Sequence, residues 1–106
     1  MIVRMWRGET PLSKADEYLR LMHEVAIPDY AATPGNLGAY ALRRDGEATA
    51  EFLMLTFWES LDVIRGFAGE DIEAARYYDF DDDFLIEKRR TVEHFATSGP
   101  PPAPAT

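Results

Sequence analysis

The chain of 106 residues contains no cysteine, which excludes a disulfide framework, a thiol nucleophile and a cysteine-ligated metal. Basic residues are few, with 11 Lys and Arg against 19 Asp and Glu and a net charge of −8. This balance argues against nucleic-acid binding, which needs a basic surface, and against docking on anionic membranes. No stretch approaches the ~20 apolar residues that span a bilayer. The first ten residues, MIVRMWRGET, lack the apolar region of a signal peptide. We therefore expect a cytoplasmic protein.

One run, EFLMLTFW at positions 51–58, is apolar on both faces of any strand it forms. Strand side chains alternate, so two sets of three point in opposite directions: Phe52, Met54 and Trp58 on one face, and Leu53, Leu55 and Phe57 on the other. Such a strand has to be covered on both sides. A chain of this length with about two helices covers only one. The sequence therefore predicts a homodimer that meets through its sheet.

The remaining pattern predicts an alternation of strands and helices. We expect strands at 2–7, 37–43, 51–58 and 88–96, helices at about 11–27 and 60–69, and a further short helix at 71–78. The first helix carries an apolar stripe at helical spacing, and Pro28 is expected to end it because the residue before proline avoids helical geometry. Residues 29–36 are expected to be a loop, and residues 80–86 irregular or one helical turn.

This order, strand-helix-strand-strand-helix-strand, is that of the ferredoxin-like α+β fold (βαββαβ), with an antiparallel sheet and helices on one face. The composition, 46% hydrophobic, is that of a folded chain. We expect one domain over residues 1–97. The last nine residues, SGPPPAPAT at 98–106, cannot build a core and are expected to form a disordered tail rich in proline.

Five segments carry a likeness to a known family: TFWES at 56–60, FAG at 67–69, the tyrosine pair at 77–78, PGNLG at 34–38 and VEHF at 92–95. Together they resemble the antibiotic biosynthesis monooxygenase family, over about residues 1–96. The resemblance implies a dimeric α/β barrel, built from two sheets back to back, with a pocket in each subunit between sheet and helices. Some members of that family oxidise aromatic polyketides with O2 and no bound cofactor, and others cleave haem.

The haem-cleaving branch uses an Asn, a Trp and a His together, and the resemblance places Gly8, Phe67 and Arg76 at those positions. None of the three matches, which weakens the haem interpretation. His23 or His94 remains as a possible haem ligand, since haem iron needs a donor such as imidazole.

Six residues are candidates for the site that the resemblance implies. Four aromatic side chains are expected to bind substrate: Trp58, Phe67, Tyr77 and Tyr78. Adjacent residues cannot both face one way, so at most one of the two tyrosines is expected inside. Two further residues are candidate catalytic groups: Arg76, as a cation that stabilises a substrate anion, and His94, as a base. The alternatives are structural, with Trp58 a core anchor, Arg76 a surface ion pair and His94 a packed or interface residue.

An acidic run, DFDDD at 79–83, invites comparison with a calcium loop. An EF-hand loop starting at Asp79 needs Gly at its sixth position and Glu at its last. The chain has Phe84 and Arg90 there, so a solvated acidic loop is expected. No metal-ligand spacing of histidines, Ser-His-Asp set or P-loop occurs.

Three functions stay open on the sequence alone. The first is a monooxygenase without cofactor that acts on a small flat aromatic or polyketide-like molecule. The second is a non-enzymatic module that binds a small apolar or aromatic ligand. The third is haem binding or haem degradation.

Overall fold

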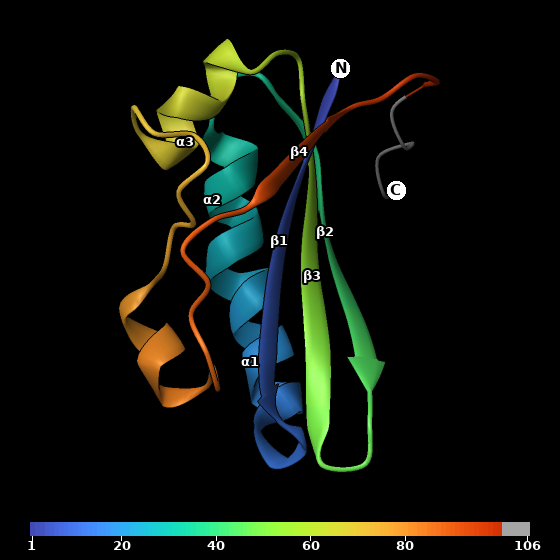
Figure 1. Ribbon diagram of the computed structural model, residues 1–106, viewed down its shortest axis with the longest axis vertical. Coiled ribbons are helices and arrows are strands. Elements are labelled where there is room, and N and C mark those ends of the chain that lie inside the picture. Colours follow the sequence, from blue (N-terminus) through green and yellow to red (C-terminus); the bar gives the residue numbers. More distant parts are fainter. Residues whose placement is uncertain (101–106) are drawn as a thin grey trace.

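The computed structural model describes residues 1–100, and the prediction for the tail from residue 101 onward lies outside the described residues. An antiparallel sheet with strand order β2-β3-β1-β4 carries helices on one side (Figure 1). The strands are β1 (Ile2–Pro11), β2 (Asn36–Asp45), β3 (Thr49–Trp58) and β4 (Glu93–Ala96). The helical elements are η1 (Leu12–Lys14), α1 (Ala15–Leu21), η2 (Met22–Ala26), α2 (Ile27–Ala32), η3 (Asp62–Ile64), α3 (Arg65–Ala68) and η4 (Asp79–Asp83). This confirms the ferredoxin-like α+β fold.

Strands β1 and β3 form the centre of the sheet and pair over their whole length, from Ile2 opposite Trp58 to Pro11 opposite Thr49. The hairpin between β2 and β3 turns at Gly46, whose N–H donates to the carbonyl of Thr49 at 2.8 Å. This is where the Asp-Gly pair predicts a hairpin. Strand β4 is shorter than expected: it covers Glu93–Ala96, not residues 88–96.

The first helix runs five residues past its expected end at Ile27, to Ala32, and part of the expected loop at 29–36 is helical. The segment η2 is a π-helix, in which the N–H of Ile27 donates to the carbonyl of Met22. The next helical stretch starts at Ile27, so Pro28 lies in a first turn, where its missing N–H costs little. The prediction that Pro28 ends the helix was wrong for this reason.

The second helical region is short and ends at Gly69, as expected, where φ is 89°. Residues 71–78 do not form the predicted helix. They run beside the approach to β4, with an isolated bridge between Ala74 and Thr91. The carbonyls of Ile72 and Ala74 accept hydrogen bonds from the Arg4 side chain instead of from a helical backbone. The single turn η4 agrees with the expectation for residues 80–86.

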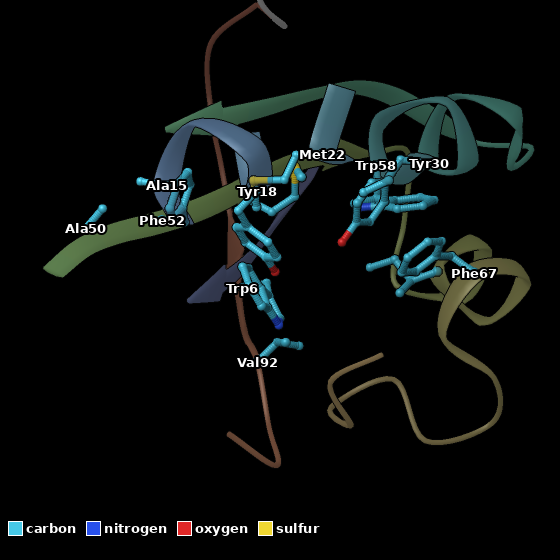
Figure 2. Close-up of a cluster of buried hydrophobic side chains, with 13 residues drawn as sticks. Trp6, Ala15, Tyr18, Met22, Tyr30, Ala50, Phe52, Trp58, Phe67 and Val92 are labelled. Carbon is cyan, nitrogen blue, oxygen red and sulfur yellow. The ribbon is translucent and has the colours of Figure 1, made fainter. Parts of the chain in front are cut away.

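The helix-covered face of the sheet, called the helix face below, carries the core (Figure 2). On β3 every second residue points into it, and all five are buried: Ala50, Phe52, Met54, Thr56 and Trp58. The opposite face, called the open face below, carries the other predicted set from β3, Leu53, Leu55 and Phe57, each half-buried. The predicted alternation of the strand is therefore confirmed. The open face also holds Leu42 and Phe95, which are 41% and 48% exposed.

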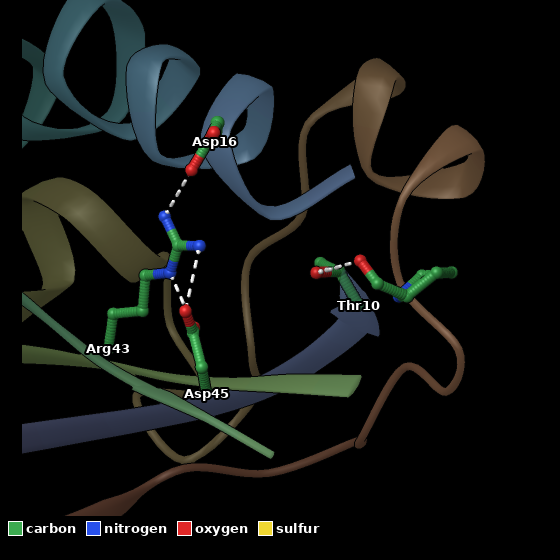
Figure 3. Close-up of polar contacts among 5 residues, drawn as sticks. Thr10, Asp16, Arg43 and Asp45 are labelled. Carbon is green, nitrogen blue, oxygen red and sulfur yellow. Dashed lines mark hydrogen bonds and ion pairs between the residues drawn. The ribbon is translucent and has the colours of Figure 1, made fainter. Parts of the chain in front are cut away.

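A polar contact ties the start of the helix layer to the sheet (Figure 3). Arg43 on β2 lies 2.8 Å from Asp16 of α1 and binds Asp45 through two nitrogens, at 2.7 and 3.1 Å. Exposed ion pairs stabilise a fold by only about 0–1 kcal/mol. This contact therefore orients the helix on the sheet more than it stabilises the domain.

Candidate functional site

The long helix presents one row of buried side chains to the sheet, with Tyr18, Met22, Ala26 and Tyr30 four residues apart. Steps of four exceed the α-helical turn of 3.6 residues by about 40° each. In a regular α-helix, three such steps would turn Tyr30 well away from Tyr18. The wider π-helical turn at 22–26 offsets this drift. Two phenols twelve residues apart therefore reach the same side of the helix.

A pocket lies where this row, the sheet and the segment after α3 meet. Its lining comes from all three parts: Trp6 and Met54 from the sheet; Tyr18, Met22, Ala26 and Tyr30 from the helix; and Arg76, Tyr78, Phe80 and Asp81 from the later segment. The cavity volume is about 20 Å³, room for about one water molecule. It lies between sheet and helices, where the resemblance implies a pocket.

Asp81 is the buried acid of this pocket, only 2% exposed. Its Oδ1 accepts a hydrogen bond from the hydroxyl of Tyr18 at 2.7 Å, and its Oδ2 accepts one from the backbone N–H of Tyr78 at 2.7 Å. Burial raises the pKa of Asp81, and burial together with the nearby carboxylate raises the pKa of Tyr18. The expectation of a wholly solvated acidic loop was wrong here, because η4 turns Asp81 inward while Asp82 and Asp83 stay exposed.

Arg76 and Tyr78 meet on a second carboxylate, Asp29 of α2. The hydroxyl of Tyr78 donates to Asp29 Oδ2 at 2.7 Å, and Nη2 of Arg76 lies 3.1 Å from the same oxygen. Arg76 also donates from Nη1 to the carbonyl of Phe67 at 3.2 Å, and its guanidinium lies 4.6 Å from the centre of the Phe67 ring. Asp29 and Phe67 therefore hold the cation at the rim of the pocket, where the Arg76 side chain is 40% exposed and forms the surface ion pair of the structural alternative.

Tyr30 lies behind this rim. Its ring stacks on Phe67 at 4.1 Å between centroids, and no hydrogen bond to its hydroxyl is found among the described residues. Burial raises the pKa of Tyr30 to about 12, although the charges of Arg4 and Arg76 act in the opposite direction. Figure 2 shows the Tyr30 side chain beside Trp58 and close to Phe67.

Arg4 on β1 is a buried cation, 2% exposed. It donates to the carbonyls of Ile72 and Ala74 at 2.7 and 3.1 Å, and it forms no ion pair with a carboxylate within residues 1–100. Its Nε has no hydrogen-bond partner there. Arg4 therefore anchors the start of the segment that carries Arg76 and Tyr78. This anchoring role could not be predicted from the sequence, because a single Arg in a strand is expected to lie on the surface.

His94 faces Arg4 across β1 and β4 and does not line the pocket. Its Nε2 is buried and has no hydrogen-bond partner among the described residues. Burial, with a smaller contribution from the charge of Arg4, lowers the pKa of His94. A neutral imidazole is therefore favoured at this position.

The remaining predicted residues divide between pocket and core. Tyr78 lines the pocket, whereas Tyr77 points elsewhere and donates to the carbonyl of Arg89 at 2.5 Å. Trp58 is fully buried, and its indole N–H donates to Thr56 Oγ1 at 2.8 Å. Phe67 packs between Tyr30 and Trp58. Of the six predicted residues, the structure thus brings Arg76 and Tyr78 to the pocket lining.

The three positions that the resemblance assigns to haem cleavage, Gly8, Phe67 and Arg76, carry no side chain that ligates haem iron. A side chain at Gly8 would place its Cβ 2.4 Å from the Trp6 ring, so an Asn has no room there unless Trp6 moves. Arg76 is engaged with Asp29 and Phe67, and His23 is exposed on the helix. Within the described part of the chain, no group of His, Asp and Glu is arranged to hold a metal ion.

The chain resembles known proteins in its fold but not in its sequence. No protein-family model and no curated protein sequence matches the chain. Its structure is similar to that of a protein from Nitrosomonas europaea, provisionally assigned as an antibiotic biosynthesis monooxygenase, with a TM-score of 0.67 and 14% identity over 92% of this chain and 98% of that one. A protein from Bacillus cereus with the same provisional assignment gives a TM-score of 0.59 and 10% identity over 93% and 96%.

A third similar structure is the haem degrader MhuD from Mycobacterium tuberculosis, with two haems bound in its active site. It gives a TM-score of 0.57 and 17% identity over 92% of this chain and 95% of that one. The chain thus has the fold of antibiotic biosynthesis monooxygenase proteins, and the resemblance predicted from its sequence is confirmed at that level. No helix among residues 1–100 has the length and apolar character to cross a membrane.

Proposed function

We propose that this protein is a small monooxygenase that works without a bound cofactor on a flat aromatic or polyketide-like molecule. The observation that carries the proposal is the composition of the pocket. Its apolar surfaces, from Trp6, Met22 and Met54, face a wall of polar groups from Arg76, Tyr78 and Asp81. Ligand sites combine a mostly apolar concavity with a few placed polar groups in this way.

Arg76 is the proposed stabiliser of the substrate anion. Oxygenation without a cofactor requires an electron-rich anion of the substrate, such as a phenolate or enolate. A fixed cation lowers the energy of such an anion most when it is already oriented before reaction. The contacts of Arg76 with Asp29, the Phe67 carbonyl and the Phe67 ring support this role, because they hold the guanidinium in place.

Substrate entry requires side chains to move, because a cavity of about 20 Å³ is far smaller than a flat aromatic molecule. The wall that we expect to move is the part of segment 69–91 around Tyr78, because this segment has no regular element except η4. Tyr78 and Arg76 both contact the pocket and share Asp29 Oδ2. We expect the ligand to displace Tyr78 from Asp29, while Arg76 keeps its contacts with Asp29 and Phe67.

The proposed partner is a second copy of the chain. Its docking surface is the open face, where Leu42, Leu55 and Phe57 leave apolar surface exposed to solvent. Contiguous apolar patches of this kind mark interaction sites. Covering the open face in a homodimer leaves the pocket accessible on the other side of each sheet. The proposal includes no nucleic acid and no membrane as partner.

The second candidate function is a binding module without catalysis. It is favoured by the position of His94, the predicted base, which does not line the pocket. The two functions separate in one experiment. Small molecules that copurify with the protein are identified by mass spectrometry, and O2 consumption is then measured with them and with a panel of hydroxynaphthalenes and hydroxyanthraquinones.

If the protein is an oxygenase, Arg76→Gln lowers turnover by ~10- to 1,000-fold with little change in KM, because the anion forms only along the reaction path. The matched control is Arg65→Gln, which removes an exposed Arg paired with Asp62 outside the pocket. An unchanged rate in Arg76→Gln, or ligand binding by wild type without O2 consumption, favours the binding module.

A further inference from the structure

A buried pair, Tyr18 and Asp81, lies in the pocket and is not used by the roles assigned above. We propose that this pair is the proton acceptor of the pocket, so that its ligand is a weak acid, a phenol or an enolisable ketone, which is bound as its oxyanion. This inference rests on the proposed function, since it concerns a ligand in the same pocket. It names the base that neither His94 nor any other predicted residue supplies there.

The burial of the pair is the first argument. Tyr18 and Asp81 are each 2% exposed, and Asp81 is the one buried carboxylate among residues 1–100. Acidic side chains are almost never fully buried unless they are paired. Asp81 has no ion pair within the described residues and is held by two neutral donors, the Tyr18 hydroxyl and the Tyr78 N–H. A buried carboxylate that forms no ion pair is poised to take up a proton, although the charge of the nearby Lys88 opposes this.

Of the two hydrogen bonds that Asp81 accepts, only one is explained by a structural role in capping η4. Oδ2 of Asp81 accepts the Tyr78 N–H and so caps the single turn η4. An exposed Asp at this position would cap the turn equally well, as capping does not require burial. The contact of Oδ1 with the Tyr18 hydroxyl reaches 63 residues along the chain to the helix and lies in the pocket wall. This second contact is the one that the proposal explains.

The geometry defines a path for the proton. The Tyr18 hydroxyl donates its hydrogen to Asp81 and keeps its oxygen lone pairs free to accept. When a ligand hydroxyl donates to Tyr18, the ligand O–H bond breaks and a new O–H bond forms on the Tyr18 oxygen. The former Tyr18 proton moves to Asp81 Oδ1 in the same step. The products are a ligand oxyanion, a neutral Tyr18 and a protonated Asp81, so charge and protons balance.

The other charged groups near the pocket suit this division of roles. Arg76 lines the same pocket and supplies the positive charge for the ligand oxyanion. Asp29 is a poorer base, because it is partly exposed and already engaged by Arg76 and Tyr78. Burial raises the pKa of Asp81, which brings this carboxyl closer to the range of a weak organic acid and makes proton transfer less unfavourable.

The test uses a flat chromogenic phenol, alizarin, whose neutral and ionised forms absorb at different wavelengths. It is added at a pH below its own pKa, so that most of the free dye is neutral, but high enough that Asp81 is ionised before the dye binds. Wild-type protein is expected to bind the dye as the anion without releasing a proton to the medium, because Asp81 takes the proton. Release is measured in weakly buffered solution with a pH indicator or by calorimetry in two buffers.

Two variants remove the acceptor while keeping its shape. Asp81→Asn can still accept the Tyr78 N–H, and Tyr18→Phe keeps the ring contacts with Phe52, Phe80 and Phe84. In both, the ratio of bound anion to bound neutral dye is expected to fall by tenfold or more. The matched control is Asp83→Asn, which removes the same charge two residues along the chain, from an exposed Asp. It should bind the dye as wild type does.

The results separate the role of Tyr18 and Asp81 from the proposed function of the protein. Anionic dye in wild type and both variants, or one proton released per dye bound to wild type, overturns the Tyr18–Asp81 role and leaves Arg76 as the reason for anion binding. Neutral dye in the wild type also overturns it. Failure of the wild type to bind alizarin or any hydroxynaphthalene overturns the proposed function together with this inference.

Discussion

The two faces of the sheet differ in what covers them, although β3 offers apolar side chains to both. On the helix face, Phe52 and Trp58 are fully buried under the helix layer. On the open face, Leu55 and Phe57 are only half-buried, because no further element of residues 1–100 lies over them. Figure 1 shows the helices gathered on one side of the sheet. Side chains of the same strand are therefore expected to stabilise the fold by different amounts, according to the face on which they lie.

The chemistry of the two faces differs as well. The helix face and the segment packed on it hold the buried polar groups of the domain, including Arg4, Thr56 and Asp81. The open face is mostly apolar along β3, with an exposed ion pair of Arg7 and Glu93 near its edge. The difference agrees with the proposal that one face builds the pocket and that the other binds a second copy of the chain.

The largest expected effect comes from cutting a side chain on the helix face. Phe52→Ala should lower the free energy of unfolding by about 3–5 kcal/mol, because it leaves a cavity in a packed core. The Phe52 ring lies 5.1 Å from that of Tyr18, so the pocket should loosen as well. Denaturant unfolding followed by circular dichroism measures the loss, which should be independent of protein concentration.

The matched change on the open face is Phe57→Ala. In an isolated chain this half-buried ring would contribute about 1 kcal/mol. In a homodimer it contributes more, and the loss depends on protein concentration because association and folding are linked. A loss of the same size as for Phe52→Ala at every concentration would mean that the open face is covered within one chain.

The second prediction places a charge on the open face. Leu55→Asp should convert the homodimer to a monomer of half its mass, because an unpaired carboxylate at an apolar interface loses its hydration. Sedimentation at micromolar concentration measures the change. The neighbouring residue Thr56 points into the helix face and is not a test of the interface. A stable 12.0 kDa wild-type monomer in the same measurement would contradict the homodimer itself.

The fold was predictable because its signals are local. The alternation along β3, the Asp-Gly turn and the stop at Gly69 each follow from spacing or backbone geometry. The long helix was cut short in the prediction because Pro28 is a reliable local signal that a π-helical turn overrides. The helix predicted at 71–78 does not form, because backbone carbonyls of this segment bind Arg4, which lies more than 65 positions away in the sequence.

The pocket was only partly predictable for a related reason. Arg76 and Tyr78 were named because the resemblance places a pocket on their side of the helix. Tyr18 and Asp81 were not named, because a helix stripe and an acidic run have ordinary structural explanations. Tyr30 was missed because it was expected in a loop and lies in α2. A buried acid is visible only when contacts across the chain are known, and a 2.7 Å bond over 63 residues leaves no local pattern.

The third prediction concerns a smaller effect, at the edge of the helix face. Since the pKa of His94 is lowered in the folded protein, the unfolded chain binds the proton more readily there as pH falls below its ordinary value of about 6.5. The contribution of His94 to the free energy of unfolding is therefore fully present above this pH and is lost as the pH falls below it.

The measurement is the free energy of unfolding at about pH 7.5 and about pH 5.5. His94→Gln should lose less stability across this interval than the wild type. His23→Gln is the control, because His23 is exposed on the helix and should behave as the wild type. Equal losses in wild type and His94→Gln would show that the half-buried imidazole does not resist protonation.

The smallest effect is expected from removing the tail, which tests whether anything in the same chain covers the open face. Truncation after Thr97 deletes SGPPPAPAT, a segment with no apolar side chain larger than proline or alanine. Such a segment adds little to burial, so Tm and the dimer mass should stay nearly unchanged. A drop in Tm of more than a few degrees, together with a gain in exposed apolar surface measured by dye binding, would mean that the tail lies over Leu55 and Phe57. The open face would then be closed within one chain, and it would leave no surface for a second copy.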